Sequence, residues 1–199
     1  MIANLSTPKM TPQEYLDWEE QQPLRYEYFD GEVVAMTGGT IPHNQVAVNL
    51  ASLLKNHLRG KGCKILTSDA KVKLSDNGPY CYADVSVTCD ERDRHARQFI
   101  RYPSLIVEVL SPSTEAFDRG KKFRKYRRIQ TLKEYALIDP DRMSLECYRI
   151  NERGNWELFH YFVEDTEDCE VFLASIDLRF SLAALYEDVE FDEDNELME

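Results

Sequence analysis

The sequence has no apolar run approaching the roughly 20 residues that a membrane-spanning helix needs. Its first ten residues also lack the basic and then apolar pattern of a signal peptide, so we expect a cytoplasmic protein. No GxSxG, Walker-type, GxGxxG or HExxH pattern occurs anywhere in the chain. The signatures of the common serine hydrolases, NTPases, dinucleotide-binding enzymes and zinc proteases are therefore missing.

No two of the five cysteines form a CxxC pair, which argues against a zinc knuckle or a thioredoxin-like motif. The odd count and the missing signal peptide also argue against a disulfide framework. We expect each cysteine to be a small apolar side chain in or near a strand. The five are Cys63, Cys81, Cys89, Cys147 and Cys169.

Basic residues are outnumbered 24 to 36 by acidic ones, and the net charge of -12 counts against a nucleic-acid partner. The charge is unevenly distributed, however. Residues 186–199 contain eight acids and no base, whereas residues 119–128 contain seven bases. A phosphate backbone responds to the local field, so the basic stretch keeps DNA among the expected partners. We predict one domain over residues 1–185 and an acidic, disordered tail over residues 186–199.

Helical signatures occur in four places. Thr11, followed by a proline and then Glu14, forms a capping box that starts a helix. Residues 44–59 have apolar side chains at helical spacing, and Gly60 and Gly62 follow them, so a second and longer helix is predicted there. A basic helix and a short C-terminal helix complete the set. The four predicted helices span residues 11–20, 44–59, 118–129 and 182–186.

Strand signatures include two hairpins, the first of which turns at Asp30-Gly31. Residues 104–110 are almost all apolar, as expected of a strand buried on both faces. The predicted order of helices and strands indicates an α/β or α+β fold with a mixed sheet and helices on its faces. Strands are predicted at residues 25–36 and 145–162 as hairpins, and at residues 63–66, 70–74, 82–88, 104–110 and 134–138.

Two acids interrupt strand-like runs. Glu108 lies in the most hydrophobic strand, and Asp84 lies inside the predicted strand at residues 82–88. A carboxylate in such a place is costly unless it is paired or binds a metal. Two of them could hold one hard cation with oxygen ligands. The alternative is a structural ion pair with an arginine of the basic helix, and spacing alone leaves both open.

Lys122, on the basic helix, could reach back to the end of the strand that carries Glu108. A lysine near a metal can orient the attacking water or neutralise charge on a phosphate. The alternative for residues 119–128 is a solvated helix face, although like charges spaced four apart repel. His43 precedes the long predicted helix, where a capping or surface role is the alternative to a catalytic one.

Several of these residues together resemble a known family. The pattern comprises Tyr26-Glu27, Asp30-Gly31-Glu32, His43, Tyr82–Val85, Ile106–Thr114, Asp118-Arg119 with Lys122 and Tyr126, and Glu134-Tyr135. It resembles the Uma-two family of endonucleases, which is abundant in cyanobacteria and belongs to the PD-(D/E)xK superfamily. The resemblance covers residues 10–161. It implies a restriction-endonuclease-like mixed central sheet flanked by helices, with added β-hairpins.

By this resemblance, Asp84 and Glu108 bind Mg²⁺ or Mn²⁺ together with the backbone carbonyl of Val109, and Glu27 is an additional catalytic acid. Ala83 stands where the superfamily has proline. Leu110 stands where it has the motif lysine, and Lys122 looks like the substitute. The implied activity is metal-assisted hydrolysis of DNA phosphodiester bonds.

Four residues are candidate contacts to that substrate: His43, Arg119, Lys121 and Lys125. A homodimer is an attractive assembly, because two sites cut both strands of a duplex most simply. Two other functions stay open. The acidic charge and the displaced lysine favour a non-catalytic binding module that keeps the fold, whereas a metal-dependent hydrolase of a small phosphorylated ligand would tolerate an acidic protein.

Overall fold

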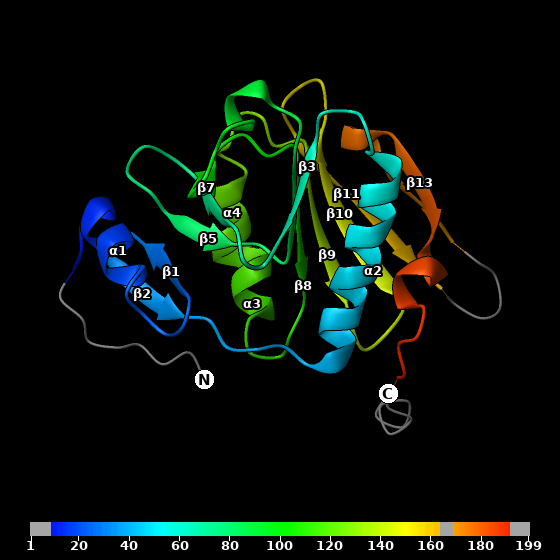
Figure 1. Cartoon of the computed structure of the whole chain (residues 1–199). Helices are drawn as coiled ribbons and strands as arrows, with labels where there is room; N and C mark the ends of the chain where they lie inside the picture. Colours follow the sequence, from blue (N-terminus) through cyan, green and yellow to red (C-terminus); the bar gives the residue numbers. More distant parts are fainter. Residues whose placement is uncertain (1–8, 164–168, 192–199) are drawn as a thin grey trace.

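A six-stranded sheet forms the centre of the protein (Figure 1). The computed structural model describes residues 9–163 and 169–191. The middle strands β8 (Leu105–Val109) and β9 (Glu134–Asp139) run parallel, and all five residues of β8 are buried, as predicted. The other neighbours are antiparallel. The strand order is β11 (Trp156–Phe162), β10 (Ser144–Ile150), β9, β8, β6 (Val85–Thr88) and β3 (Lys64–Thr67).

Helix α2 (Ile41–His57) covers one face of this sheet (Figure 1). Its buried residues Val46, Leu50 and Leu54 pack in one core cluster with side chains of β6 and β8. The helix begins three residues before its predicted start, because the Thr40 side chain accepts a hydrogen bond from the His43 N–H and caps the first turn.

The basic segment covers the opposite face as a single helical stretch. It comprises α3 (Glu115–Phe117), the π-helical η2 (Asp118–Lys122) and α4 (Phe123–Tyr126). The buried Tyr126 packs with β8 and β9 side chains in a second core cluster. A π-helical turn leaves backbone groups without their usual partners, and the Tyr135 hydroxyl donates to the Asp118 carbonyl (3.1 Å).

A second sheet of five strands holds the predicted first hairpin. Helix α1 (Pro12–Glu19) packs on it with the predicted capping box intact, and Tyr15 stacks on Tyr28. Strand β7 (Phe99–Ile100) and the short helix η1 (Glu91–Asp93) lie in a segment for which the sequence predicted neither a helix nor a strand. The strand order is β2 (Glu32–Ala35), β1 (Tyr26–Phe29), β5 (Tyr80–Tyr82), β4 (Lys71–Lys73) and β7 (Phe99–Ile100).

The predicted strand over residues 82–88 is wrong in one respect, because the chain changes sheets in its middle. β5 ends at Tyr82 in one sheet and β6 begins at Val85 in the other. Asp84 lies between these two strands and belongs to neither. Its carboxylate accepts a hydrogen bond from the Val109 N–H (2.8 Å). Asp84 therefore lies at the junction of the two sheets, beside the end of β8.

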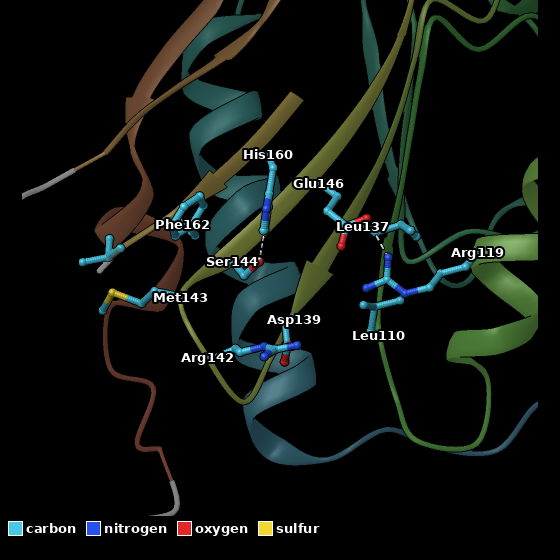
Figure 2. Close-up of a pocket in the computed structure, with 11 residues that line it drawn as sticks. Leu110, Arg119, Leu137, Asp139, Arg142, Met143, Ser144, Glu146, His160 and Phe162 are labelled. Atoms are coloured by element: carbon cyan, nitrogen blue, oxygen red, sulfur yellow. Dashed lines mark hydrogen bonds and ion pairs between the residues drawn. The ribbon is translucent and has the colours of Figure 1, made fainter. Parts of the chain in front are cut away.

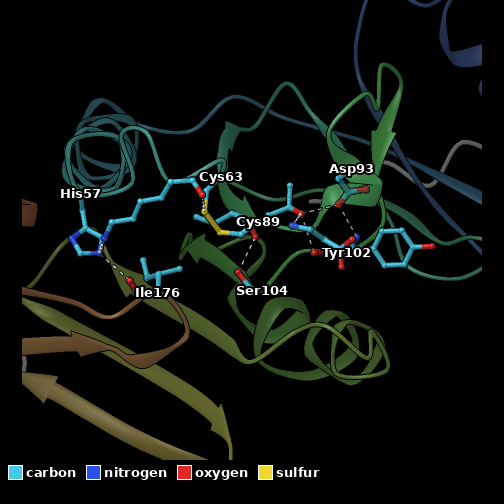
Figure 3. Close-up of a disulfide and its surroundings, with 11 residues drawn as sticks. His57, Cys63, Cys89, Asp93, Tyr102, Ser104 and Ile176 are labelled. Carbon is cyan, nitrogen blue, oxygen red and sulfur yellow. Dashed lines mark hydrogen bonds between the residues drawn. A yellow bond between two sulfur atoms is a disulfide. The ribbon is translucent and has the colours of Figure 1, made fainter.

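The expectation that no disulfide forms is also wrong. Cys63 and Cys89 are bonded to each other at the ends of β3 and β6 (Figure 3). Lys64 pairs with Thr88 in the antiparallel ladder, so the next residues outward face each other, with Cα atoms 4.1 Å apart. Cys81 and Cys147 are buried in strands, as predicted, and Cys169 is partly buried.

The C-terminal part adds a two-stranded sheet that the sequence did not predict, β12 (Glu170–Leu173) with β13 (Leu178–Ser181), linked by η3 (Ala174–Ile176). The predicted helix at residues 182–186 is the 3₁₀ helix η4 (Leu182–Tyr186). Tyr186 is buried, and its hydroxyl donates to the Asp139 carbonyl (2.7 Å). The predicted tail lies outside the described residues from residue 192 onward. Among the described helices, none is both long and apolar enough to cross a membrane.

Candidate active site

Three carboxylates surround one lysine in the interior, where the two sheets meet the basic helix. Lys122 Nζ lies 3.0 Å from Glu108 Oε1, 3.3 Å from Glu27 Oε1 and 3.5 Å from Asp118 Oδ1. All four residues are buried, none more than 7% exposed. We call Glu27, Glu108, Asp118 and Lys122 the Lys122 cluster.

Each element delivers its residue for a simple geometric reason. Side chains alternate along β8, so Glu108 points with Ile106 toward the basic helix. Asp118 and Lys122 lie four residues apart on that helix and so share a face. Glu27 comes from β1 of the second sheet, and the Tyr82 N–H fixes its carboxylate with a 2.9 Å hydrogen bond.

Burial dominates the electrostatics of the cluster. It raises the pKa of the Glu108 carboxyl well above its usual range, and the neighbouring acids add to this effect while Lys122 opposes it. Burial likewise raises the pKa of Glu27 and of Asp118. For Lys122, burial favours the neutral form, but the three carboxylates outweigh it and raise the pKa of the ammonium well above its usual range. Lys122 therefore stays protonated.

One oxygen of the cluster is not satisfied. Although Glu108 Oε1 lies close to Lys122 Nζ, it accepts no hydrogen bond of good geometry from any residue that the structure describes. A buried oxygen in this state carries a desolvation penalty that a bound ligand would relieve.

Asp84 lies next to the cluster and contacts both Glu108 and His43. Its backbone N–H lies 3.4 Å from Glu108 Oε2, while its Oδ2 lies 3.5 Å from His43 Nε2. Burial lowers the pKa of His43, but the hydrogen bond to Asp84 and the negative charge there outweigh it and raise that pKa overall. A Cβ at Gly39 would come within 2.7 Å of His43 Nδ1, so this glycine leaves room for the ring.

The donor set fits a hard divalent cation. Asp84 and Glu108 offer carboxylate oxygens, Val109 offers its carbonyl, and Glu108 Oε1 has lone pairs to spare. Within residues 9–163 and 169–191, no group of three or more acidic, histidine or cysteine side chains is arranged to hold an ion. Mg²⁺ needs only one or two carboxylates, because it keeps several waters and binds substrate phosphates.

Three of the four predicted substrate contacts lie on the basic helix, and two of these, Arg119 and Lys125, are paired with acids. Arg119 pairs with Glu115 (2.7 Å) and Glu146 (2.6 Å). Lys125 pairs with Asp30 (2.6 Å) at the β1–β2 turn, and Lys121 lies 5.9 Å from the centre of the Phe29 ring. Of the four predicted contacts, only His43 touches Asp84.

The sequence did not single out Asp118 as a site residue. A signal was available, because Asp118 stands four residues before Lys122 and the two therefore lie on one helical face. The sequence left open that Glu108 forms an ion pair with an arginine of the basic helix. Glu108 does form an ion pair, but its partner is Lys122.

Comparison with models of known protein families identifies the family of the chain. The model of the Uma2 family, described as "Putative restriction endonuclease", matches residues 12–182. The chain belongs to the Uma2 family. This is the Uma-two family that the sequence motifs resemble, so the resemblance is confirmed.

Two uncharacterized proteins of Synechocystis sp. are similar over most of their length. One is 45% identical over 184 residues, which are 92% of this chain and 95% of that protein. The other is 33% identical over 169 residues, or 84% and 96%. A crystal structure of "a putative nuclease belonging to DUF820" from Anabaena variabilis has a TM-score of 0.72 at 19% identity, covering 89% of this chain and 98% of that one. This likeness confirms the predicted fold.

Proposed function

We propose that this protein is a metal-dependent DNA endonuclease that hydrolyses phosphodiester bonds beside Asp84 and Glu108. The observation that carries the proposal is the buried Glu108 carboxylate, whose Oε1 accepts no hydrogen bond among the described residues and faces a protonated lysine. Membership of the Uma2 family, described as "Putative restriction endonuclease", supports the same reaction class.

Asp84, Glu108 and the Val109 carbonyl would hold Mg²⁺ or Mn²⁺. When bound, such an ion lowers the pKa of a water molecule and stabilises negative charge on the phosphate. Lys122, whose Nζ lies 3.0 Å from Glu108 Oε1, would take the role of the motif lysine that Leu110 replaces.

Lys122 acts as a hydrogen-bond donor and not as a base. Its pKa is raised well above the usual range of lysine, so Nζ keeps its proton at neutral pH. From Nζ it can orient the attacking water or a phosphate oxygen, and its positive charge opposes the charge that develops there. Glu27 and Asp118 are positioning residues, because both carboxylates hold this ammonium in place.

His43 orients the other side of the site. Its ring lies against Asp84 Oδ2, the oxygen that also accepts the Val109 N–H. This arrangement fixes one rotamer of Asp84. A homodimer of the chain would supply two such sites for the two strands of a duplex.

Cleavage of supercoiled plasmid in the presence of Mg²⁺ or Mn²⁺ tests the proposal. We expect metal-dependent nicking by the wild type and a loss of roughly a hundredfold or more in Asp84→Asn, as for other groups that stabilise transition-state charge. Asp69→Asn is the matched control, since Asp69 is an exposed acid paired with Arg25 away from the cluster, and it should cleave normally.

Equal cleavage by Asp84→Asn and the wild type would overturn the proposed site. Absence of cleavage together with absence of Mg²⁺ or Mn²⁺ binding in calorimetric titration would overturn the enzyme and favour a binding module. Release of phosphate from small phosphorylated compounds, without nicking, would favour the small-ligand hydrolase.

A further inference from the structure

A cavity of about 350 Å³ opens where the strands β8 and β9 end (Figure 2). Leu110, which lines it, follows Val109 directly in the chain. Leu137, another lining residue, is the register partner of Glu108 across the parallel ladder, so both side chains point to the same face. The cavity and the candidate active site are therefore neighbours on one face of the sheet.

One wall of the cavity is aromatic. His160 and Phe162 are two residues apart on β11, so their side chains share a face of the sheet. Their ring centroids are 4.8 Å apart, and the ring planes are tilted by 35°. The Ser144 hydroxyl lies 2.9 Å from His160 Nε2 and fixes that ring. Phe162 is nonetheless 44% exposed, so it offers a supported aromatic face to a ligand.

The other walls carry charges of both signs. Arg142 pairs with Asp139 (2.6 Å), and Arg119 pairs with Glu146 (2.6 Å), all four lining the same cavity. A bare phosphate would meet two carboxylates here. A nucleobase suits the lining better, because its edge carries both hydrogen-bond donors and acceptors and its faces stack on aromatic rings.

We propose that this cavity receives a nucleobase from a single-stranded or locally unpaired DNA segment whose backbone passes Asp84 and Glu108. The proposal rests on the proposed function for the identity of the polymer. The group recognised is the base beside the cleaved phosphate, and Phe162 and His160 form its stacking platform. The volume lies at the lower end of the range of ligand pockets.

Binding of a fluorescently labelled single-stranded oligonucleotide, measured by anisotropy in EDTA, tests the cavity without cleavage. We expect Phe162→Ala to weaken binding about tenfold, the usual loss for one base–aromatic stack. Leu158→Ala is the matched control, since Leu158 is 52% exposed on the same strand but does not line the cavity. Its affinity should equal that of the wild type.

A second oligonucleotide with abasic sites separates base from backbone recognition. Phe162→Ala and the wild type should bind it equally, because no base is left to stack. An unchanged affinity of Phe162→Ala for the normal oligonucleotide would overturn the proposal. An equal loss on both oligonucleotides, an equal loss in Leu158→Ala, or no binding by the wild type would overturn it as well.

The two proposals fail separately. Loss of stacking in Phe162→Ala together with no metal-dependent cleavage by the wild type would leave the base site standing and remove the nuclease. Cleavage that depends on Asp84, with normal oligonucleotide binding by Phe162→Ala, would remove the base site alone.

Discussion

At the scale of single residues, two buried acids on neighbouring parallel strands differ in how completely their carboxylate oxygens are hydrogen-bonded. Glu134, at the start of β9, is fully buried and accepts hydrogen bonds from Arg149 Nε, Ala174 N and Ser175 N. Glu108, on β8, keeps an oxygen without any such donor in the described part of the chain. The difference lies in the number of hydrogen-bond donors that reach each carboxylate in the folded protein.

Glu134→Ala should unfold far more easily than the wild type. The change leaves the Arg149 guanidinium without its carboxylate and two backbone N–H groups of the β12–β13 connection without acceptors. We expect a loss of about 3–5 kcal/mol in the free energy of unfolding, measured in urea. Glu157→Ala, at an exposed position of β11, should lose no more than about 0.5 kcal/mol. Equal stability of the two variants would contradict this role.

Glu108 gives the metal-free protein an unusual pH dependence. Its folded pKa is raised above the unfolded value, so its contribution to stability is present below about pH 4 and is lost as pH rises through the folded pKa. The unfolding free energy of the wild type minus that of Glu108→Gln should therefore fall with rising pH, by at most about 1.4 kcal/mol per pH unit. Urea unfolding in EDTA at several pH values measures this difference. A difference that stays constant or increases with pH would contradict the raised pKa.

At the scale of secondary-structure elements, the site depends on contacts between segments distant in the chain. The π-helical turn of η2 presents Asp118 and Lys122 to β8, and the crossing between β5 and β6 presents Asp84 to the end of the same strand. The edge strand β3 is fastened to β6 by the Cys63–Cys89 disulfide, at the end of β6 remote from Asp84 (Figure 3).

Loss of this disulfide should destabilise the fold and leave the site geometry intact. The bonded cysteines are 26 residues apart, and the entropy that a cross-link of this length removes from the unfolded chain corresponds to about 3.5 kcal/mol. We expect Cys63→Ser/Cys89→Ser to lose about this much in chemical unfolding, while its affinity for Mg²⁺ is unchanged. Cys169→Ser is the control, because Cys169 is a free cysteine. A double variant as stable as this control would show that the bond contributes nothing.

At the scale of the whole molecule, charge is the feature that conflicts with a DNA substrate. The net charge is -12, and five of the acids lie in residues 192–199. Ion pairs to Asp30, Glu115 and Glu146 also neutralise part of the basic helix. Any DNA that reaches the site must therefore approach against a repulsive overall field.

Removal of residues 192–199, which changes the net charge from -12 to -7, should strengthen DNA binding. The gain should appear mainly in the association rate and should shrink as salt screens the field. Stopped-flow binding of a labelled oligonucleotide at low and high salt measures it. A full-length variant with the five acids replaced by their amides separates charge from chain length, and it should behave like the truncation. Unchanged association rates in both variants would contradict an inhibitory tail.

Much of the candidate site could be predicted because its residues stand in recognisable local sequence patterns. A carboxylate inside an apolar strand marks Glu108, and short motifs mark Asp84, Lys122 and Glu27. Asp118 was missed as a site residue, since a single acid at a helix start usually serves the helix. The cavity was missed altogether. Arg142 lies in the β9–β10 turn, Ser144 on β10 and His160 on β11, and only the hairpin register brings these three residues together.

The sequence by itself determined the capping box of α1, the first hairpin, the buried strands β8 and β9, and the family, because each depends on residues close together in the chain or on motifs in fixed order. The tertiary structure alone decided the break at Asp84, the disulfide, the β12–β13 sheet and the unsatisfied oxygen of Glu108. Each of these depends on which strands become neighbours. That choice is set by the burial of the whole core, and no local pattern encodes it.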